Sequence, residues 1–85
     1  KGCYIGDLLS WVMGRAEADQ AWITIMSNLN IVAVATLADV SCIILCEGVT
    51  LEESVKSTAE AKGVNILATE APAYETAKRL AELGL

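Results

Sequence analysis

Three short polar side chains stand where the second apolar segment of the chain gives way to a helical pattern. Ser27, Asn28 and Asn30 come at or directly after the end of an apolar segment at 21–26. A hydroxyl and two amides at such a point can hydrogen-bond a small polar or anionic ligand, because the start of a helix also presents unpaired N–H groups. The same residues can instead satisfy those N–H groups as helix caps, with no ligand at all. The sequence leaves both interpretations open.

Three acidic residues occupy similar positions after the other apolar segments. Asp7, Glu47 and Glu70 each stand at a predicted junction between a strand and a helix. Carboxylates brought together at one sheet edge can transfer protons or hold a cation. A single acid at a helix start, however, is usually placed there by its favourable interaction with the helix dipole. Their spacing matches no metal-binding motif, so we expect capping carboxylates, with no metal site and no cofactor.

The common signatures of catalysis and of nucleic-acid binding are absent from the sequence. The chain has no histidine, and its six Lys and Arg against eleven Asp and Glu give a net charge of −5. General base catalysis by imidazole is therefore excluded. No G-x-x-x-x-G-K-[ST] or G-x-S-x-G motif is present, which excludes a P-loop for ATP and a nucleophile elbow. We expect no catalytic residues and no nucleic-acid partner.

Four short apolar segments alternate with helical patterns along the chain, at 3–6, 21–26, 41–46 and 64–69. This spacing is typical of repeated βα units, and the segment at 41–46 is nearly continuous in apolar character, as in a parallel strand covered on both faces. The sequence predicts one α/β domain over residues 1–85, with four βα units forming a mainly parallel four-stranded sheet flanked by helices.

Each predicted helix has a start signal. These signals are Asp7 for a helix at 8–16, Ser27 or Asn28 for one at 29–38, a capping box of Thr50 and Glu53 for one ending at Gly63, and Pro72 for one at 73–83. The predicted inward residues are Leu8, Trp11 and Val12 in the first helix and Tyr74, Ala77 and Leu80 in the last. We expect both tryptophans, Trp11 and Trp22, in the core or in an interface.

The three cysteines and the longest uncharged stretch indicate the cellular compartment of the protein. Cys42 and Cys46 share one face of a predicted strand about 13 Å apart, too far for a disulfide, so we expect buried thiols and a reducing cytoplasm. The stretch at 20–38 is long enough to cross a membrane, but its Ser and Asn side chains would need internal partners in lipid. We therefore expect no transmembrane helix.

Extended segments of this chain resemble the DRTGG domain family. They read GDLLSWVMG at 6–14, AWIT at 21–24, NIVAVA at 30–35 and APAYETAKRL at 71–80. The resemblance implies an α/β fold shared with the N-terminal domain of HPr serine kinase/phosphatase, and a regulatory or ligand-sensing role. The kinase chemistry of such proteins belongs to a separate P-loop domain. Members often carry further residues before this region, so we expect an N-terminal extension ahead of Lys1.

The sequence departs from the signature that names the family. The Asp-Arg of that signature would fall near Ser27 and Asn28, and its Thr-Gly-Gly near Cys46, Glu47 and Gly48, where only Gly48 matches. Binding roles of those signature residues therefore do not carry over, although the two loops remain polar. We expect any ligand to lie across the second and third strand ends, at Ser27, Asn28, Asn30, Cys46, Glu47 and Gly48.

These observations lead to a non-catalytic regulatory domain that forms a homodimer and senses a small ligand or contacts a regulated protein. Glu47 favours a neutral or zwitterionic ligand over a purely anionic one. A mean hydropathy of +0.47 leaves more apolar residues than one small core can bury, which indicates a dimer. Two alternatives are a pure dimerisation or protein-interaction module and an enzyme subunit with an unrecognised site.

Overall fold

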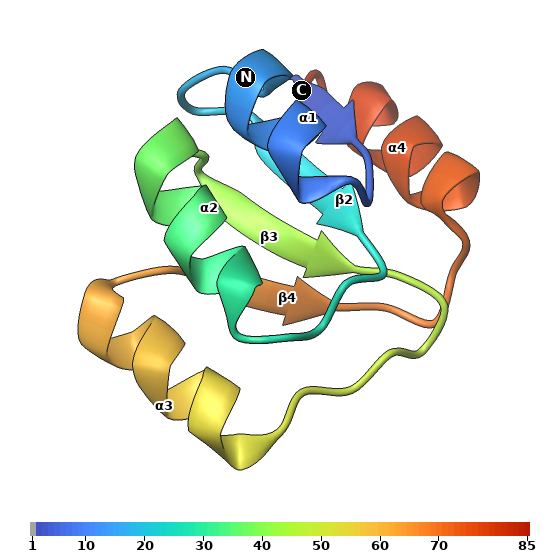
Figure 1. The fold of residues 1–85 in the computed structure, drawn as a ribbon. Helices are drawn as coiled ribbons and strands as arrows, with labels where there is room; N and C mark the ends of the chain where they lie inside the picture. Colours follow the sequence, from blue (N-terminus) through green and yellow to red (C-terminus); the bar gives the residue numbers. More distant parts are fainter. Residues whose placement is uncertain (1) are drawn as a thin grey trace.

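The computed structural model describes residues 2–85, in which four strands alternate with four helices (Figure 1). In chain order these are β1 (Cys3–Ile5), α1 (Leu9–Arg15), β2 (Ala21–Thr24), α2 (Asn30–Ala38), β3 (Cys42–Leu45), α3 (Glu53–Lys62), β4 (Ile66–Ala68) and α4 (Ala73–Glu82). The predicted α/β class with four βα units is confirmed. Lys1 lies outside the described residues.

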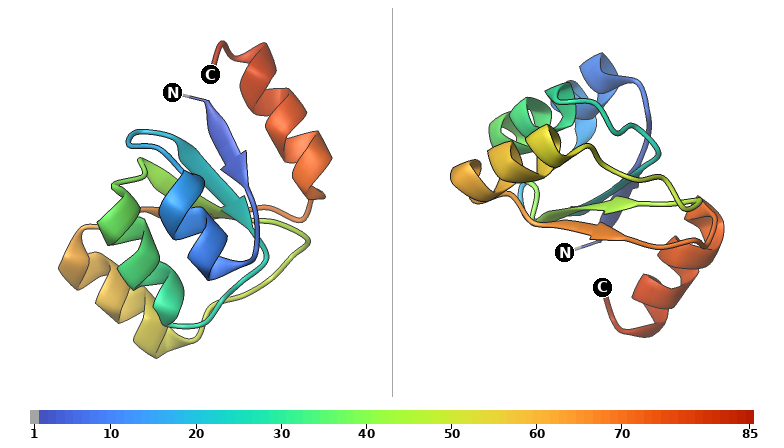
Figure 2. Two further views of the ribbon diagram at one scale, coloured as in Figure 1. Left: turned by 45° about the horizontal axis from the view of Figure 1, so that its top comes forward. Right: turned by 90° about the horizontal axis from the view of Figure 1, so that it is seen from below.

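The strands are all parallel and follow one another across the sheet in the order β1-β2-β3-β4. Right-handed crossovers that always step in the same direction place their helices on the same face of the sheet. Accordingly, α1, α2 and α3 cover one face, and only α4, which follows the last strand, lies on the other (Figure 2). The sheet thus has one face with three helices and one face with a single helix.

Alternate residues of the strands feed two separate cores. Trp22, Ile43 and Leu45 point toward α1, α2 and α3, and pack with Val12 of α1 and with the buried residues of α2 and α3. Their neighbours along the strands point toward α4 and form a smaller cluster of Ala21, Ile23, Ile44 and Cys46. The apolar character of both faces explains why β3 reads as a continuous apolar segment.

Trp22 anchors the larger core, whereas Trp11 does not enter it. Trp22 is fully buried, and its indole N–H donates to the Gly6 carbonyl at 2.9 Å. Trp11 is 53% exposed, and the Arg15 guanidinium lies 3.8 Å from its ring centroid. The prediction of two tryptophans in the core or an interface is therefore confirmed for Trp22, while Trp11 stacks with Arg15 at the surface. Of the predicted inward residues of α1, only Val12 is buried.

The buried stripe of α4 differs from the predicted one by a single position. Ala73, Ala77 and Leu80 are partly buried against the smaller core, and Thr76 is buried, whereas Tyr74 is 77% exposed. A stripe at i, i+4 and i+7 follows the 3.6-residue period, while a stripe that starts at Tyr74 would advance by three residues twice and drift off the face. The prediction for Tyr74 was wrong for this reason.

The predicted capping box of α3 does not form. The helix begins at Glu53, its N-cap is Glu52, and no side chain caps it. The connection between β3 and α3 is longer than predicted. Leu51 packs against the larger core, so Thr50 does not take the N-cap position. The predicted end is correct, because Gly63 follows α3 with a φ of 71°.

All three cysteines are free, as expected from their spacing. Cys3 and Cys42 lie on either side of Ala21 in the sheet, and burial together with the neighbouring Cys42 raises the pKa of the Cys3 thiol. Cys46 is completely buried. Within residues 2–85, none of the helices has the length and apolar character needed to cross a bilayer.

The two tryptophans offer a matched test of this core. Replacing Trp22 by Phe removes part of a fully buried side chain and leaves the Gly6 carbonyl without its donor, so we expect a loss of about 2 kcal/mol in the free energy of unfolding. The same replacement at Trp11 should change it by less than about 0.5 kcal/mol. Urea denaturation of both variants measures this, and equal losses would contradict the packing described here.

Candidate functional site

The loops that follow β2 and β3 start side by side at the carboxyl edge of the sheet (Figure 1). Thr24 ends β2 opposite Leu45 of β3, and the next residue, Cys46, donates its N–H to the Thr24 carbonyl at 3.1 Å. The two loops in which we predicted a ligand site are therefore neighbours, as parallel strands require.

The loop after β1 is tied to the same place by Asp7. The Asp7 carboxylate accepts a hydrogen bond from the Thr24 hydroxyl at 2.7 Å and another from the Ile25 N–H at 3.0 Å. It does not cap α1, whose N-cap is Leu8 and has no side-chain hydrogen bond. The capping prediction for Asp7 was wrong, because its oxygen is used to join β1 and β2 instead.

Asn28 caps the start of α2. Leu29, directly before the helix, already has helical backbone angles (φ −62°, ψ −26°), and the side-chain oxygen of Asn28 accepts the Asn30 N–H at 2.9 Å. The Asn28 carbonyl accepts the Ile31 N–H at 3.2 Å. The helix-start signal predicted at Asn28 is thus confirmed, and ligand binding at this loop stays a prediction. The side chains of Ser27, which is half-buried, and Asn30, which is exposed, make no hydrogen bond to any residue of 2–85. Among the residues predicted in this loop, these two side chains can still bond to a ligand.

The turn after β3 is held by backbone hydrogen bonds to the loop after β4. Glu47 donates its N–H to the Ala71 carbonyl and Gly48 to the Thr69 carbonyl, both at 3.0 Å. Both Glu47 and Gly48 have positive φ, of 62° and 73°. These are the left-handed conformations that glycine adopts most easily. The turn thus places two exposed residues, Glu47 and Gly48, beside the loop after β4.

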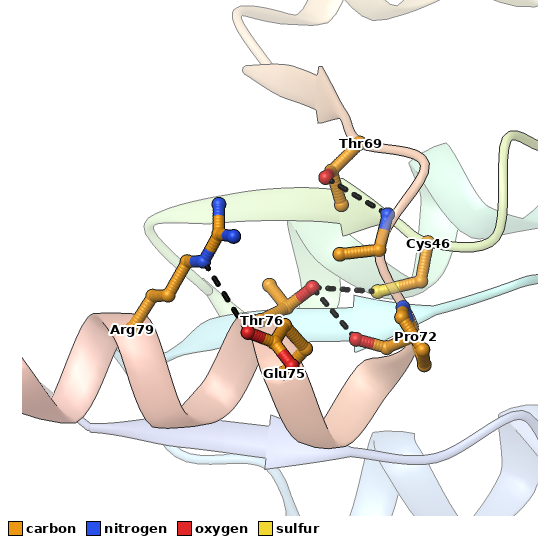
Figure 3. A network of polar contacts seen from close by, with 7 residues as sticks. Cys46, Thr69, Pro72, Glu75, Thr76 and Arg79 are labelled. Carbon is orange, nitrogen blue, oxygen red and sulfur yellow. Dashed lines mark hydrogen bonds and ion pairs between the residues drawn. The ribbon is translucent and has the colours of Figure 1, made fainter.

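Cys46 points away from that turn. Its sulfur lies 3.5 Å from the Thr76 hydroxyl on α4, and this hydroxyl in turn donates to the Pro72 carbonyl at 2.9 Å (Figure 3). The Cys46 side chain is therefore enclosed between the sheet and α4, and its backbone is the part that lies in the turn. Side chains at the predicted site come from Ser27, Asn28, Asn30 and Glu47.

Within residues 2–85, α3 follows β3 on one face of the sheet, whereas α4 follows β4 on the other face. The helices therefore diverge at the ends of these two strands. Such a divergence opens a ligand crevice in many parallel sheets. Here the two hydrogen bonds from Glu47 and Gly48 draw the two loops together. A cavity of about 370 Å³ lies instead between α3 and the edge of β4, and a groove of about 410 Å³ lies along α2 and α3 and includes Asn30.

Three threonines that were not predicted as site residues organise these loops. The hydroxyls of Thr24 and Thr69 each accept the N–H of the residue two positions later, which turns the chain at the ends of β2 and β4. Thr76 supplies the buried hydroxyl on α4. A threonine directly after an apolar strand segment is a signal for such a turn and could have identified the first two.

The acidic residues do not assemble into a metal site. Within residues 2–85, no three cysteine or carboxylate side chains lie close enough together to hold a metal ion. Asp7 is engaged with Thr24, whereas Glu47 and Glu70 are exposed. The candidate ligand site at the strand ends therefore offers hydroxyl, amide and carboxylate groups of loop residues.

A comparison of the sequence with models of known protein families identifies the family of this chain. The sequence model of the DRTGG domain matches residues 9–83, which are nearly the whole chain and include the loops after β2, β3 and β4. This protein belongs to the DRTGG domain family. The DRTGG domain is a regulatory domain. Comparison with curated proteins and with solved structures finds no match.

The turn at Glu47 and Gly48 gives a physical reason for the paired glycines of the DRTGG signature, which we placed at this point of the sequence. Two successive residues with positive φ favour two glycines. Here the first of the two residues is Glu47, which adopts the left-handed conformation although it is not a glycine.

We therefore expect opposite effects from two substitutions in this turn. Glu47→Gly relieves the left-handed strain and should raise the free energy of unfolding by up to about 1 kcal/mol, although glycine also gains freedom in the unfolded chain. Gly48→Ala introduces a Cβ at positive φ and should lower it by about 1 kcal/mol. Thermal denaturation of both variants tests the turn. A stabilising Gly48→Ala would show that the backbone here differs from the one described.

Proposed function

We propose that this DRTGG domain is a non-catalytic, cytoplasmic regulatory module of the type labelled HPr serine kinase-like, without the kinase domain, and that it senses a small ligand. The observation that carries the proposal is the family match over residues 9–83, together with two polar loops that start side by side at the strand ends. No P-loop for a phosphate is found in the sequence.

The hydrogen bonds of the strand-end loops support a role that is not catalytic. The carboxylate of Asp7, after the end of β1, accepts hydrogen bonds from the Thr24 hydroxyl and the Ile25 N–H. These bonds join the loop after β1 to the end of β2. A general acid or base needs a carboxylate that can reach a substrate proton. The remaining acids, Glu47 and Glu70, are exposed, and the chain has no histidine to work with them.

The proposed ligand lies against Ser27, Asn30 and the turn at Glu47 and Gly48. Ser27 and Asn30 supply a hydroxyl and an amide that make no internal hydrogen bond within the described residues. The exposed carboxylate of Glu47 disfavours a purely anionic ligand and suits a neutral or zwitterionic one. Asn28 contributes chiefly by shaping the loop, because its side-chain oxygen already caps α2.

A dimerisation module is the second candidate, and the apolar surface favours it. Large hydrophobic side chains at least half exposed occur on several elements, and they include Leu37 at 71%, Leu67 at 56% and Leu83 at 76%. Extensive apolar exposure marks protein interaction sites. We propose that the domain is a homodimer in either case, because ligand sensing and dimerisation are compatible.

Two asparagine substitutions separate a binding role from a capping role. A thermal-shift screen against nucleotides and central metabolites first identifies a ligand, since a compound at a hundredfold excess over Kd stabilises the folded state by about 2.7 kcal/mol. Asn30→Ala should abolish that shift and leave the melting temperature of the free protein nearly unchanged. Asn28→Ala should instead cost the free protein about 1 kcal/mol through loss of the cap.

The control for this experiment is an asparagine away from the proposed site. Asn65→Ala, on the loop at the opposite end of the sheet, should preserve the ligand shift. If Asn30→Ala and Ser27→Ala both keep the full shift, the ligand binds elsewhere and the proposed site is wrong. If no compound of the screen produces a shift, the dimerisation module becomes the better description.

A further inference from the structure

The outer edge of β4 carries unpaired backbone groups. The Asn65 carbonyl and the Thr69 N–H both bond to β3, at 2.9 and 2.8 Å. Successive residues of a parallel strand direct their backbone N–H and C=O groups to alternate sides of the strand. The backbone N–H and C=O of Leu67 therefore also face β3. The N–H and C=O groups of Ile66 and Ala68 therefore point outward, and they make no hydrogen bond with any residue of 2–85.

This edge lacks the usual protection against strand pairing. Residues 64–69 contain no charge and no proline, and both are devices by which edge strands normally avoid a partner. Ile66 packs toward the larger core, so Leu67 points to the other face of the sheet, where α4 packs over β2 and leaves the β4 side open (Figure 2). The Leu67 side chain is 56% exposed as a result.

The cavity of about 370 Å³ opens beside the same edge, between β4 and α3. Its lining combines apolar residues with Thr50, Lys56 and Glu60; the apolar ones include Val49, Leu51, Ala59, Val64 and Ile66. If a second strand pairs with β4, its side chains on this face of the sheet lie next to these groups. The edge thus offers both backbone hydrogen bonds and a largely apolar recess with two charged side chains in its lining.

We propose that β4 pairs with β4 of a second copy of this chain, antiparallel, about a two-fold axis at Leu67. Only residues with outward N–H and C=O groups can pair, so Ile66 of each copy lies opposite Ala68 of the other, and four backbone hydrogen bonds form. An axis at Ile66 would set Ala68 opposite Val64, whose N–H already donates to the Ala59 carbonyl at 2.9 Å. The inference rests on the proposed homodimer and assigns its surface.

The strand is complementary to itself in size. The large Ile66 side chain meets the small Ala68 of the other copy and reaches its cavity, while the two Leu67 side chains cover each other on the opposite face. A second copy therefore fits this edge.

Cysteine cross-linking locates the axis. Across a non-hydrogen-bonded antiparallel pair the Cα atoms are about 4.5 Å apart, within reach of a disulfide. Leu67→Cys should give a covalent dimer on mild oxidation, seen on a non-reducing gel. The matched control is Ile5→Cys on the opposite edge strand, where Ile5 is 50% exposed. This control and the unmodified chain should remain uncross-linked. Equal cross-linking at both positions, or cross-linking at Ile5 alone, would overturn the proposal.

A proline variant tests the backbone bonds without the cysteines. Ala68→Pro removes an outward N–H and leaves the ladder with β3 intact, so two of the four proposed bonds are lost. Sedimentation equilibrium should show a dimer of 9.0 kDa chains for the wild type and a Kd at least about tenfold higher for the variant, with an unchanged circular dichroism spectrum. Should the variant unfold, the cross-link at Leu67 decides alone.

The remaining outcomes separate this inference from the proposed function. A wild-type dimer whose Kd is unaffected by Ala68→Pro would refute pairing at β4 and leave a homodimer through another surface. A wild type that is monomeric at hundreds of micromolar would refute both the pairing and the homodimer. Neither result touches the ligand site, which the Asn30 substitution tests by itself.

Discussion

The order of the four parallel strands is the constraint on which the rest of this domain depends. Because every crossover steps in the same direction, α1, α2 and α3 are confined to one face of the sheet. Only α4 remains for the other face, and it packs over β2. The larger core, the smaller core and the thin cover over β4 are three consequences of this one arrangement. So is the free edge, because a sheet built in sequence order ends at its last strand.

The same topology decides how the strand-end loops are held. Asp7 joins the loop after β1 to the end of β2, and Glu47 and Gly48 join the loop after β3 to the loop after β4. Neighbouring loops are thus hydrogen-bonded in pairs. The loop after β2 is held at its start by Asp7, and further along it the side chains of Ser27 and Asn30 make no hydrogen bond within residues 2–85.

The sequence specified the fold more completely than the site, because the fold depends on local patterns. Apolar segments at βα spacing predicted the four strands, and Gly63 predicted the end of α3. The hydrogen bond between Asp7 and Thr24 joins residues 17 apart, so no local pattern contains it. Cys46 faces α4 because side chains alternate along the strand and because α4 lies on that face of the sheet. The sequence does not reveal the position of α4. The helix-start signal at Asn28 was predicted correctly, whereas ligand binding at this loop stays a prediction.

Hydrogen exchange at β4 tests the central claim that this strand is paired on one side and is free to pair with a second copy on the other. At high protein concentration, the account predicts slow exchange for the amides of Leu67 and Thr69 and also for those of Ile66 and Ala68. On dilution below the Kd of the dimer, Ile66 and Ala68 should become fast while Leu67 and Thr69 remain slow. Protection of all four amides at every concentration, or fast exchange at Leu67 and Thr69, would contradict the account.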